Sequence, residues 1–283
     1  MRLRNLILVV VLISFLLACS LSTVAYNNAV PLLSWFIDDY FDLQDEQRDF
    51  AKGRLANLLA WHRNSELPEY RRLLEDAIRR SQGPVTGEEV DRLYAQGKTF
   101  AARLGERALG DIADFLQKLD AGQVRTLEAR LAKGNEKFER EHIKLPYEKR
   151  VEARAVRYVD NLESWLGTLT PEQRDYVELT LRRMPLTDEM RFAERKHLQA
   201  EFLAVLKSMP PREELIARVR VLMLKPEQLR AADYRAETER WRREVPALVA
   251  WVVDHATAQQ RAHLQNKLRG YVEDVVALMR DAA

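Results

Sequence analysis

Cysteine and glycine are both scarce in this chain. Among its 283 residues there is one cysteine, Cys19, and there are only 10 glycines. Since no thiol occurs beyond Cys19, the rest of the chain forms no disulfide with itself and offers neither a catalytic thiolate nor a cysteine-ligated zinc site. Few glycines beside many Leu, Ala, Arg and Glu residues are typical of an all-α protein.

The common catalytic motifs are missing as well. The five histidines, which include His62, form no His-Glu-x-x-His or His-x-x-x-His pair. There is no Gly-x-Gly-x-x-Gly pattern, no P-loop and no Gly-x-Ser-x-Gly elbow. We therefore expect no cofactor, and any metal site would need ligands that are distant in sequence.

The amino terminus carries the pattern of a secretory signal. A short basic start is followed by an apolar run, Leu6 to Leu17, which is shorter than the roughly 20 residues of a comfortable membrane span. The sequence Leu16-Leu17-Ala18-Cys19 resembles the lipobox of bacterial lipoproteins. That resemblance implies cleavage before Cys19 and a diacylglycerol and acyl chain on this residue. An uncleaved signal anchor and a cleavable signal with an incidental cysteine are the alternatives.

The lipobox leads to an expected organisation and location. Residues 1–18 would be the signal peptide, 19–28 a short lipidated tether and 29–283 a single helical domain. Ser20, rather than Asp, follows Cys19, which resembles the outer-membrane address in the lipoprotein sorting pattern of enterobacteria. We expect the protein to be anchored to the periplasmic face of the outer membrane.

The charge balance argues against nucleic acid as a partner. The formal net charge is +2, and both excess positive charges lie in the signal segment, at Arg2 and Arg4. The remainder is formally neutral with interspersed signs, which also argues against a polybasic membrane patch.

Five related pentapeptides predict helix starts. The sharpest is Leu169-Thr170-Pro171-Glu172-Gln173, and the others begin at Leu43, Leu119, Leu224 and Ala256. In the sharpest copy, Thr170 can accept a hydrogen bond from an N–H of the first turn. Pro171 stands where its missing N–H costs nothing, and Gln173 can reach back to the capping residue.

Apolar residues recur at helical spacing between these starts, and no alternating strand pattern of useful length appears. We expect an all-α, irregular bundle of about ten helices with short connections. Separate helices are predicted over about 86–104 and 108–119. Pro226 and Pro246 are expected to separate helices in the last quarter of the chain.

One cluster is a candidate functional site. His62, Arg63 and Glu66, next to Trp61 and Tyr70, could form a proton-handling or anion-binding group at a helix end. In the alternative interpretation, Arg63 and Glu66 are a helical ion pair and His62 caps the carboxyl end of its helix.

Two other groups have a functional and a structural interpretation. Asp38 and Asp39 could bind a cation or protonate a glycosidic oxygen, although adjacent carboxylates on a helix point in different directions. Three arginines around Trp241 could form a stacking platform for an anion or merely cover an apolar groove; they are Arg240, Arg242 and Arg243.

Two resemblances extend these expectations. The Leu-Thr-x-x-Gln pattern of Leu169 to Gln173 resembles the repeat of the Spy/CpxP-like periplasmic proteins, which implies a cradle-shaped dimer that holds unfolded clients. The whole chain resembles an uncharacterised family of proteobacterial lipoproteins, a domain of unknown function. The matching residues are the lipobox, Tyr26-Asn27-Asn28, Trp35, Leu43 to Gln47, Trp61-His62-Arg63, Glu66-Leu67-Pro68, Tyr70 and Gln260-Arg261.

From these observations we expect a lipid-anchored protein that acts by binding, either to another envelope protein or to exposed apolar segments of clients. The alternative is an enzyme acting on cell-wall or lipid material, with acid–base residues drawn from His62, Glu66 or Asp38 and Asp39. A passive structural subunit of an envelope complex is the third possibility.

Overall fold

The computed structural model describes residues 21–280, and every regular element in that range is helical, with 12 α-helices. The predicted all-α fold is confirmed. The α-helices are α2 (Leu21–Asn27), α3 (Ala29–Phe41), α4 (Asp45–Ser65), α5 (Leu67–Arg80), α6 (Gly87–Leu116), α7 (Ala121–Phe138), α8 (Tyr147–Leu166), α9 (Pro171–Arg183), α10 (Asp188–Ser208), α11 (Arg212–Leu224), α12 (Ala232–Asp254) and α13 (Ala258–Arg280). A π-helical turn, η1 (Glu139–Ile143), continues α7, and a 3₁₀ turn, η2 (Pro226–Gln228), follows α11.

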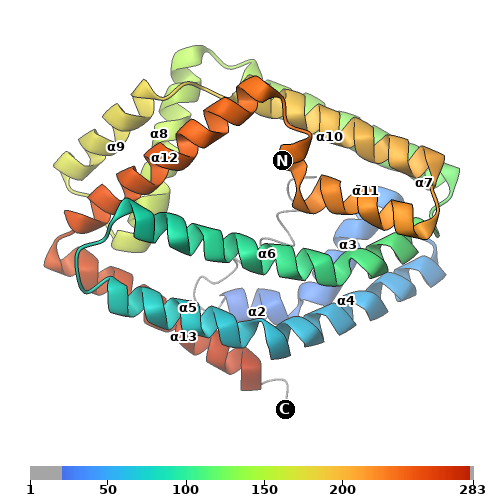
Figure 1. Cartoon of the computed structure of the whole chain (residues 1–283), viewed down its shortest axis with the longest axis horizontal. Helices are drawn as coiled ribbons and strands as arrows, with labels where there is room; N and C mark the ends of the chain where they lie inside the picture. The colour runs from blue at the N-terminus through green and yellow to red at the C-terminus, as the bar shows by residue number, and fades with distance from the viewer. Residues whose placement is uncertain (1–20, 281–283) are drawn as a thin grey trace.

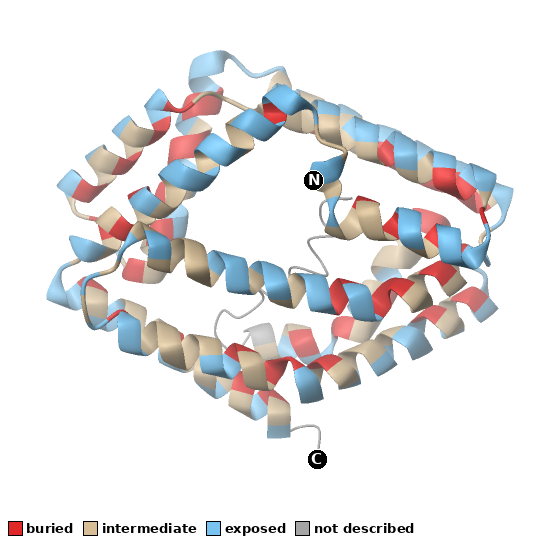
Figure 2. Ribbon diagram, viewed as in Figure 1, coloured by how far each residue is buried: buried red, intermediate tan, exposed pale blue. Residues whose placement is uncertain are grey.

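In the view of Figure 1 the helices form an oval outline. Their buried apolar side chains form three clusters, each between neighbouring helices. The first cluster joins α3, α7, α10, α11 and the end of α6. The second joins α8, α9 and α12, and the third joins α2, α5 and α13. Long helices connect the clusters: α6 carries Leu109 in the first cluster and Phe100 against the third. Figure 2 shows the buried positions along the sides where neighbouring helices meet.

Four of the five pentapeptides start helices as predicted. In each, the glutamine Oε1 accepts the backbone N–H three residues earlier, over 2.9 to 3.0 Å. These glutamines are Gln47 of α4, Gln123 of α7, Gln173 of α9 and Gln260 of α13. The prediction for the copy at Leu224 is wrong, because its residues end α11 and form the turn η2, and Gln228 is exposed.

The four capping glutamines also join their helices in pairs. Gln47 and Gln123 donate to each other's Oε1 over 2.9 and 2.6 Å, although 76 residues separate them. Gln173 and Gln260 do the same over 3.1 and 2.8 Å. All four are buried, and each also donates to a backbone carbonyl, for example Gln260 to Thr168 over 2.8 Å. The pentapeptides therefore hold the start of α4 against α7, and that of α9 against α13.

Two predicted helix boundaries are wrong. Helix α6 runs unbroken through residues 105–107, because Leu104 and Ala108 bury the same side of it and Gly105 allows close approach of Leu224. Helix α12 likewise continues through Pro246. A proline inside a helix removes one hydrogen bond, and here Trp241 and Leu248 on either side pack against the same apolar cluster.

The segment predicted to be a tether is partly helical. Residues 21–27 form α2, and Tyr26 in it is only 5% exposed. The folded part of the chain therefore begins closer to Cys19 than we expected. The predicted signal peptide and Cys19 itself lie outside the described residues.

Candidate functional site

His62 lies between two tyrosine hydroxyls at the end of α4. Its side chain is buried, with 1% of the residue exposed. Nδ1 is 2.9 Å from Oη of Tyr26 on α2, and Nε2 is 3.2 Å from Oη of Tyr70 on α5. Since a neutral imidazole has one N–H and one acceptor nitrogen, one hydroxyl donates to the ring and the other accepts from it. The ring thus connects three helices.

Burial keeps this group uncharged. Removal from water lowers the pKa of His62 to about 4, and burial raises the pKa of Tyr26 above its ordinary value. A neutral histidine with two hydroxyl partners is neither an anion site nor a ready proton donor at neutral pH. Both ring nitrogens are engaged by tyrosines, so His62 does not cap its helix as the alternative interpretation predicted.

Glu66, the single residue between α4 and α5, has a cationic partner on α6. Glu66 is 3% exposed, and its carboxylate accepts from Nη2 and Nε of Arg103, over 2.8 and 3.2 Å. This hydrogen-bonded pair raises the pKa of Arg103. Arg63 donates to Oδ1 of Asn27 over 2.8 Å, and its guanidinium lies 5.3 Å from the centre of the Tyr26 ring.

The structure therefore brings most of the predicted cluster together. His62, Glu66 and Tyr70 are buried, while Trp61 and Arg63 are half-buried on the last turns of α4. Sequence reasoning missed Tyr26 and Arg103 as their partners. Tyr26 was noted only as part of the family resemblance, and Arg103 is one of many arginines, so nothing in the sequence linked either residue to His62 or Glu66.

An open cleft of about 360 Å³ lies between α5 and α6, beside the cluster formed by His62, Glu66 and Tyr70. Leu73 and Phe100 supply its apolar side chains, and the polar lining comes from Glu69, Arg72, Asp76, Gln96, Thr99 and Arg103. Two lining residues contact the buried cluster directly. The Phe100 ring packs on Tyr70 with centroids 4.6 Å apart, and Arg103 binds Glu66. Residues of the predicted site thus hold two of the lining side chains in place, through the contacts of Tyr70 with Phe100 and of Glu66 with Arg103.

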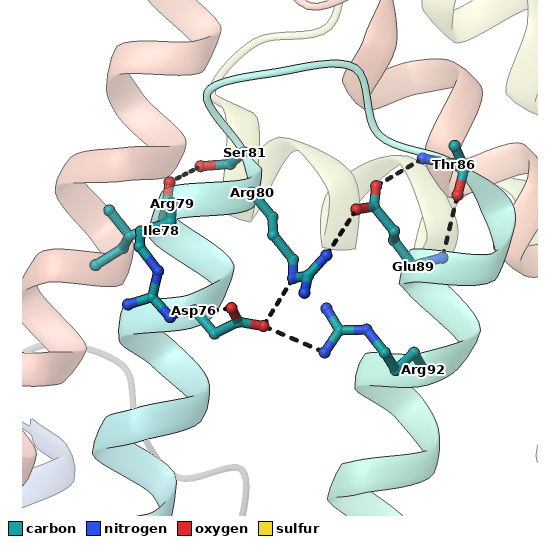
Figure 3. A network of polar contacts seen from close by, with 8 residues as sticks. All are labelled: Asp76, Ile78, Arg79, Arg80, Ser81, Thr86, Glu89 and Arg92. Carbon is teal, nitrogen blue, oxygen red and sulfur yellow. Dashed lines mark hydrogen bonds and ion pairs between the residues drawn. The ribbon is translucent and has the colours of Figure 1, made fainter.

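Ion pairs join α5 to α6 near the loop that connects these helices (Figure 3). Asp76 accepts from Arg80 over 2.8 Å and from Arg92 over 3.2 Å, and Arg80 also binds Glu89 over 3.2 Å. The two arginines hold the pKa of Asp76 below its ordinary value. Glu89 in turn accepts the backbone N–H of Thr86 at the start of α6. The network joins the two helices near this loop.

The space against His62 itself is much smaller. It is a pocket of about 10 Å³ with apolar walls that include Val30, Leu55 and Leu104. That volume is close to the minimum needed for one water molecule. A substrate has no room beside the imidazole in this arrangement.

Both acidic candidates are paired with arginines of other helices. Asp38 binds Arg48 over 3.1 Å and accepts the backbone N–H of Leu43 over 2.9 Å, while Asp39 binds Arg130 over 3.3 Å. Within residues 21–280, no group of three or more His, Cys, Asp or Glu is placed to hold a metal ion. The same stretch contains no helix that is both long and apolar enough to span a membrane.

The arginines around Trp241 do not form the predicted platform. Arg240, Arg242 and Arg243 are exposed, and Arg242 lies 3.6 Å from Asp91. The cation over the Trp241 ring is Arg154 of α8, at 5.2 Å from the centroid. Arg154 was not predicted, since nothing in its local sequence marks it as buried.

A comparison with models of protein families identifies the family of this chain. A model described as a family of unknown function (DUF6279) matches residues 39–235, which is more than half of the sequence. The chain belongs to this family. The predicted membership of an uncharacterised domain family is thereby confirmed, and the DUF6279 match includes His62, Glu66 and both helices of the cleft. No curated protein and no solved structure matches the chain.

The depressed pKa of His62 predicts a stability that falls in mild acid. The unfolded chain binds a proton near pH 6.5 and the folded protein near pH 4, so stability is complete above the first value and is lost as pH falls towards the second. Between these values His62 is expected to remove about 3 kcal/mol from the free energy of unfolding. Urea unfolding of a soluble form that lacks residues 1–19, measured across this pH range, gives the loss.

Two variants isolate the effect of His62. His62→Asn should flatten the pH dependence, leaving the smaller contributions of His142, whose pKa burial also lowers, and of carboxylates with lowered pKa values such as Asp76 and Glu189. His197 is exposed on α10, so His197→Asn should leave the pH profile unchanged. Equal profiles for the wild type and His62→Asn would contradict the prediction.

Proposed function

We propose that this protein is a lipid-anchored helical component of the cell envelope, at the periplasmic face of the outer membrane, which binds polypeptide segments in the cleft between α5 and α6. The polypeptide is either a region of another envelope protein or an exposed apolar segment of a client. The observation that carries the proposal is the cleft itself, with its apolar and charged lining side chains.

The lining suits an extended polypeptide. The volume of about 360 Å³ lies within the usual range of binding pockets, about 300 to 1,000 Å³. Leu73 and Phe100 can receive an apolar side chain, while Gln96 and Thr99 can hydrogen-bond to a peptide backbone. Arg72 and Glu69 place both signs of charge in the lining, and they bind each other over 2.6 Å. A lining that combines apolar, polar and oppositely charged side chains can bind polypeptide segments of varied sequence.

The same geometry favours binding over catalysis. An enzyme would need His62 or Glu66 within reach of a substrate. The hydroxyls of Tyr26 and Tyr70 occupy the imidazole, and Arg103 occupies the carboxylate. Both groups are therefore assigned to supporting the wall of the cleft.

The anchor and the location rest on the amino-terminal sequence. The lipobox ending at Cys19 supports lipidation, and Ser20 supports the outer membrane. Helix α2 begins two residues after Cys19, so the folded part would lie close to the membrane surface.

Filling the cleft tests the binding proposal. The soluble form, lacking residues 1–19, is expected to suppress the aggregation of an unfolded client protein. Thr99 is exposed and lines the cleft, so Thr99→Trp should fill the cleft and abolish this suppression without disturbing the fold. Ala102 is also exposed on α6 but does not line the cleft, so Ala102→Trp is the matched control.

A soluble form that neither suppresses aggregation nor binds unfolded polypeptide would reject the client branch of the proposal. Crosslinking in the native envelope then tests the second branch. A fixed partner should crosslink to a photoreactive residue at Gln96 in the cleft, and a partner captured only elsewhere on the surface would reject the cleft as the binding site.

A further inference from the structure

The segment that directly follows Cys19 carries no charged side chain. From Cys19 to Ile37 there is no Lys, Arg, Asp or Glu, although such residues make up 31% of the chain. The segment contains α2 and residues 29–37 of α3, and the last turn of α3 carries Asp38 and Asp39. Backbone hydrogen bonds from Asn28 to Val24 and from Leu32 to Asn28, over 3.0 and 3.1 Å, continue the helical pattern across the junction. Side chains of the two helices therefore keep a common helical spacing.

This spacing separates a buried face from an exposed one. Tyr26, Ala29 and Tyr40 face the interior and are 5 to 6% exposed. The opposite side, which we call the outer face, consists of Val24, Asn28, Pro31, Leu32 and Trp35. Val24 is 61% exposed, Leu32 52% and Trp35 65%. These side chains recur at intervals of three to four residues or their multiples, as one side of a helix requires.

We propose that the outer face lies in the interfacial region of the membrane to which Cys19 is anchored, with Trp35 and Leu32 among the lipid headgroups and the first acyl carbons. This inference rests on the proposed lipidation of Cys19. It adds a second contact between the protein and the lipid surface, made by side chains rather than by the acyl chains.

The length of the chain brings the outer face to the membrane. Val24 is five residues after Cys19, and even a fully extended chain of that length reaches only about 17 Å. Along a helix, the outer face from Val24 to Trp35 extends about 17 Å more, at roughly 1.5 Å per residue. A helix lying parallel to the membrane keeps all of these side chains at the level of the headgroups.

The chemistry of the outer face suits this position. Transfer of its side chains out of water desolvates no charge, and tryptophan favours the interface, where its apolar ring and its N–H are both accommodated. The first carboxylates beyond it, Asp38 and Asp39, are paired with Arg48 and Arg130. In the view of Figure 1, α2 and α3 lie on the far side of the oval, so this broad side would face the lipid.

A fluorescent label on the outer face tests the proposal. The chain's only cysteine is the one proposed to be acylated, so an introduced cysteine can be labelled alone. Leu32→Cys and Leu179→Cys form a matched pair, because the two leucines are 52% and 55% exposed and Leu179 lies on α9, far along the chain. Each full-length lipidated variant would carry the dye NBD and be reconstituted into phosphatidylethanolamine–phosphatidylglycerol vesicles containing doxyl-labelled lipid.

The proposal predicts a blue-shifted emission at position 32 and several-fold stronger quenching by the doxyl lipid there than at position 179. Equal, weak quenching at both positions in protein that floats with the vesicles would overturn the interfacial contact while leaving the anchor intact. A blue shift without lipid quenching means that protein, such as a second copy, covers the face, and it overturns the proposal too.

The anchor is tested separately. Cys19→Ala is expected to lose flotation with the vesicles, because weak interfacial contact alone does not replace acyl chains. If Cys19→Ala floats as fully as the wild type, the proposed lipidation fails, whatever the labels at positions 32 and 179 report.

Discussion

Replacing Gln173 with alanine is expected to lower the free energy of unfolding by about 4 kcal/mol, since the change combines a lost helix cap with unpaired polar groups in the interior. The Gln173 Oε1 accepts the Thr170 N–H over 2.9 Å and the Gln260 amide over 2.8 Å. Its own amide donates to Gln260 and to the carbonyl of His255, both over 3.1 Å. The residue is 1% exposed, so water does not readily replace these partners.

The fifth pentapeptide supplies the matched control. Gln228 occupies the equivalent position but is exposed and makes no cap in the turn η2. Gln228→Ala should therefore change stability by less than about 0.5 kcal/mol. Urea unfolding of the soluble form measures both variants. Equal losses for Gln173→Ala and Gln228→Ala would show that the paired amides contribute nothing.

Replacing Gln173 with glutamate, a charged residue of similar shape, tests the paired amides more sharply. Gln173→Glu keeps the shape but removes the N–H donors, so a carboxylate would face the Oε1 of Gln260 and the carbonyl of His255. We expect Gln173→Glu to lower the free energy of unfolding at least as much as Gln173→Ala does.

In the double variant Gln173→Ala with Gln260→Ala, the loss should be well below the sum of the single losses, since the second change removes a partner that is already unpaired.

Replacing Arg154 with methionine should also lower the free energy of unfolding by about 4 kcal/mol, because several carbonyls lose their donor at once. Arg154 is 5% exposed. It donates to the carbonyls of Leu181, Met184 and Pro185 over 2.7, 2.9 and 2.9 Å. Burial lowers the pKa of Arg154, but a guanidinium stays charged at neutral pH, and its charge is favourable at the carboxyl end of α9.

The control for this variant lies on the same helix. Arg157 is exposed on α8, so Arg157→Met should be nearly neutral. Since Arg154 also lies over the Trp241 ring, Arg154→Met should change the native tryptophan fluorescence, whereas Arg157→Met should not. A stability loss no larger than that of Arg157→Met would mean that water satisfies the three carbonyls equally well.

The helix starts were predictable because their chemistry is local. A capping residue and a glutamine three positions later satisfy backbone N–H groups within one turn, whatever surrounds them. That logic held for Gln47, Gln123, Gln173 and Gln260. It was wrong for Gln228, where the preceding helix α11 ends at Leu224 and leaves residues 226–228 in a 3₁₀ turn. The sequence also did not predict that α6 and α12 are unbroken, since packing along one side of each helix keeps it continuous.

The candidate site was only half predictable. His62, Glu66 and Tyr70 are close in sequence, and one helix junction brings them together. Their partners are not: Tyr26 is 36 residues from His62, and Arg103 is 37 residues from Glu66. The cleft also depends on the separation of α5 and α6, which together supply all of its lining side chains. No pattern in the sequence encodes that separation.

The sequence by itself therefore determined what depends on neighbours within a turn: the helical class and four of the five helix starts predicted from the pentapeptides. The proposed anchor also rests on sequence alone, through the resemblance of residues 16–19 to a lipobox. Only the tertiary structure decided which helix ends meet through paired glutamines, which charges are buried, and where a cleft opens. The physical reason is that local hydrogen bonds are set by fixed spacing along the chain, whereas burial depends on side chains that distant segments bring to the same place.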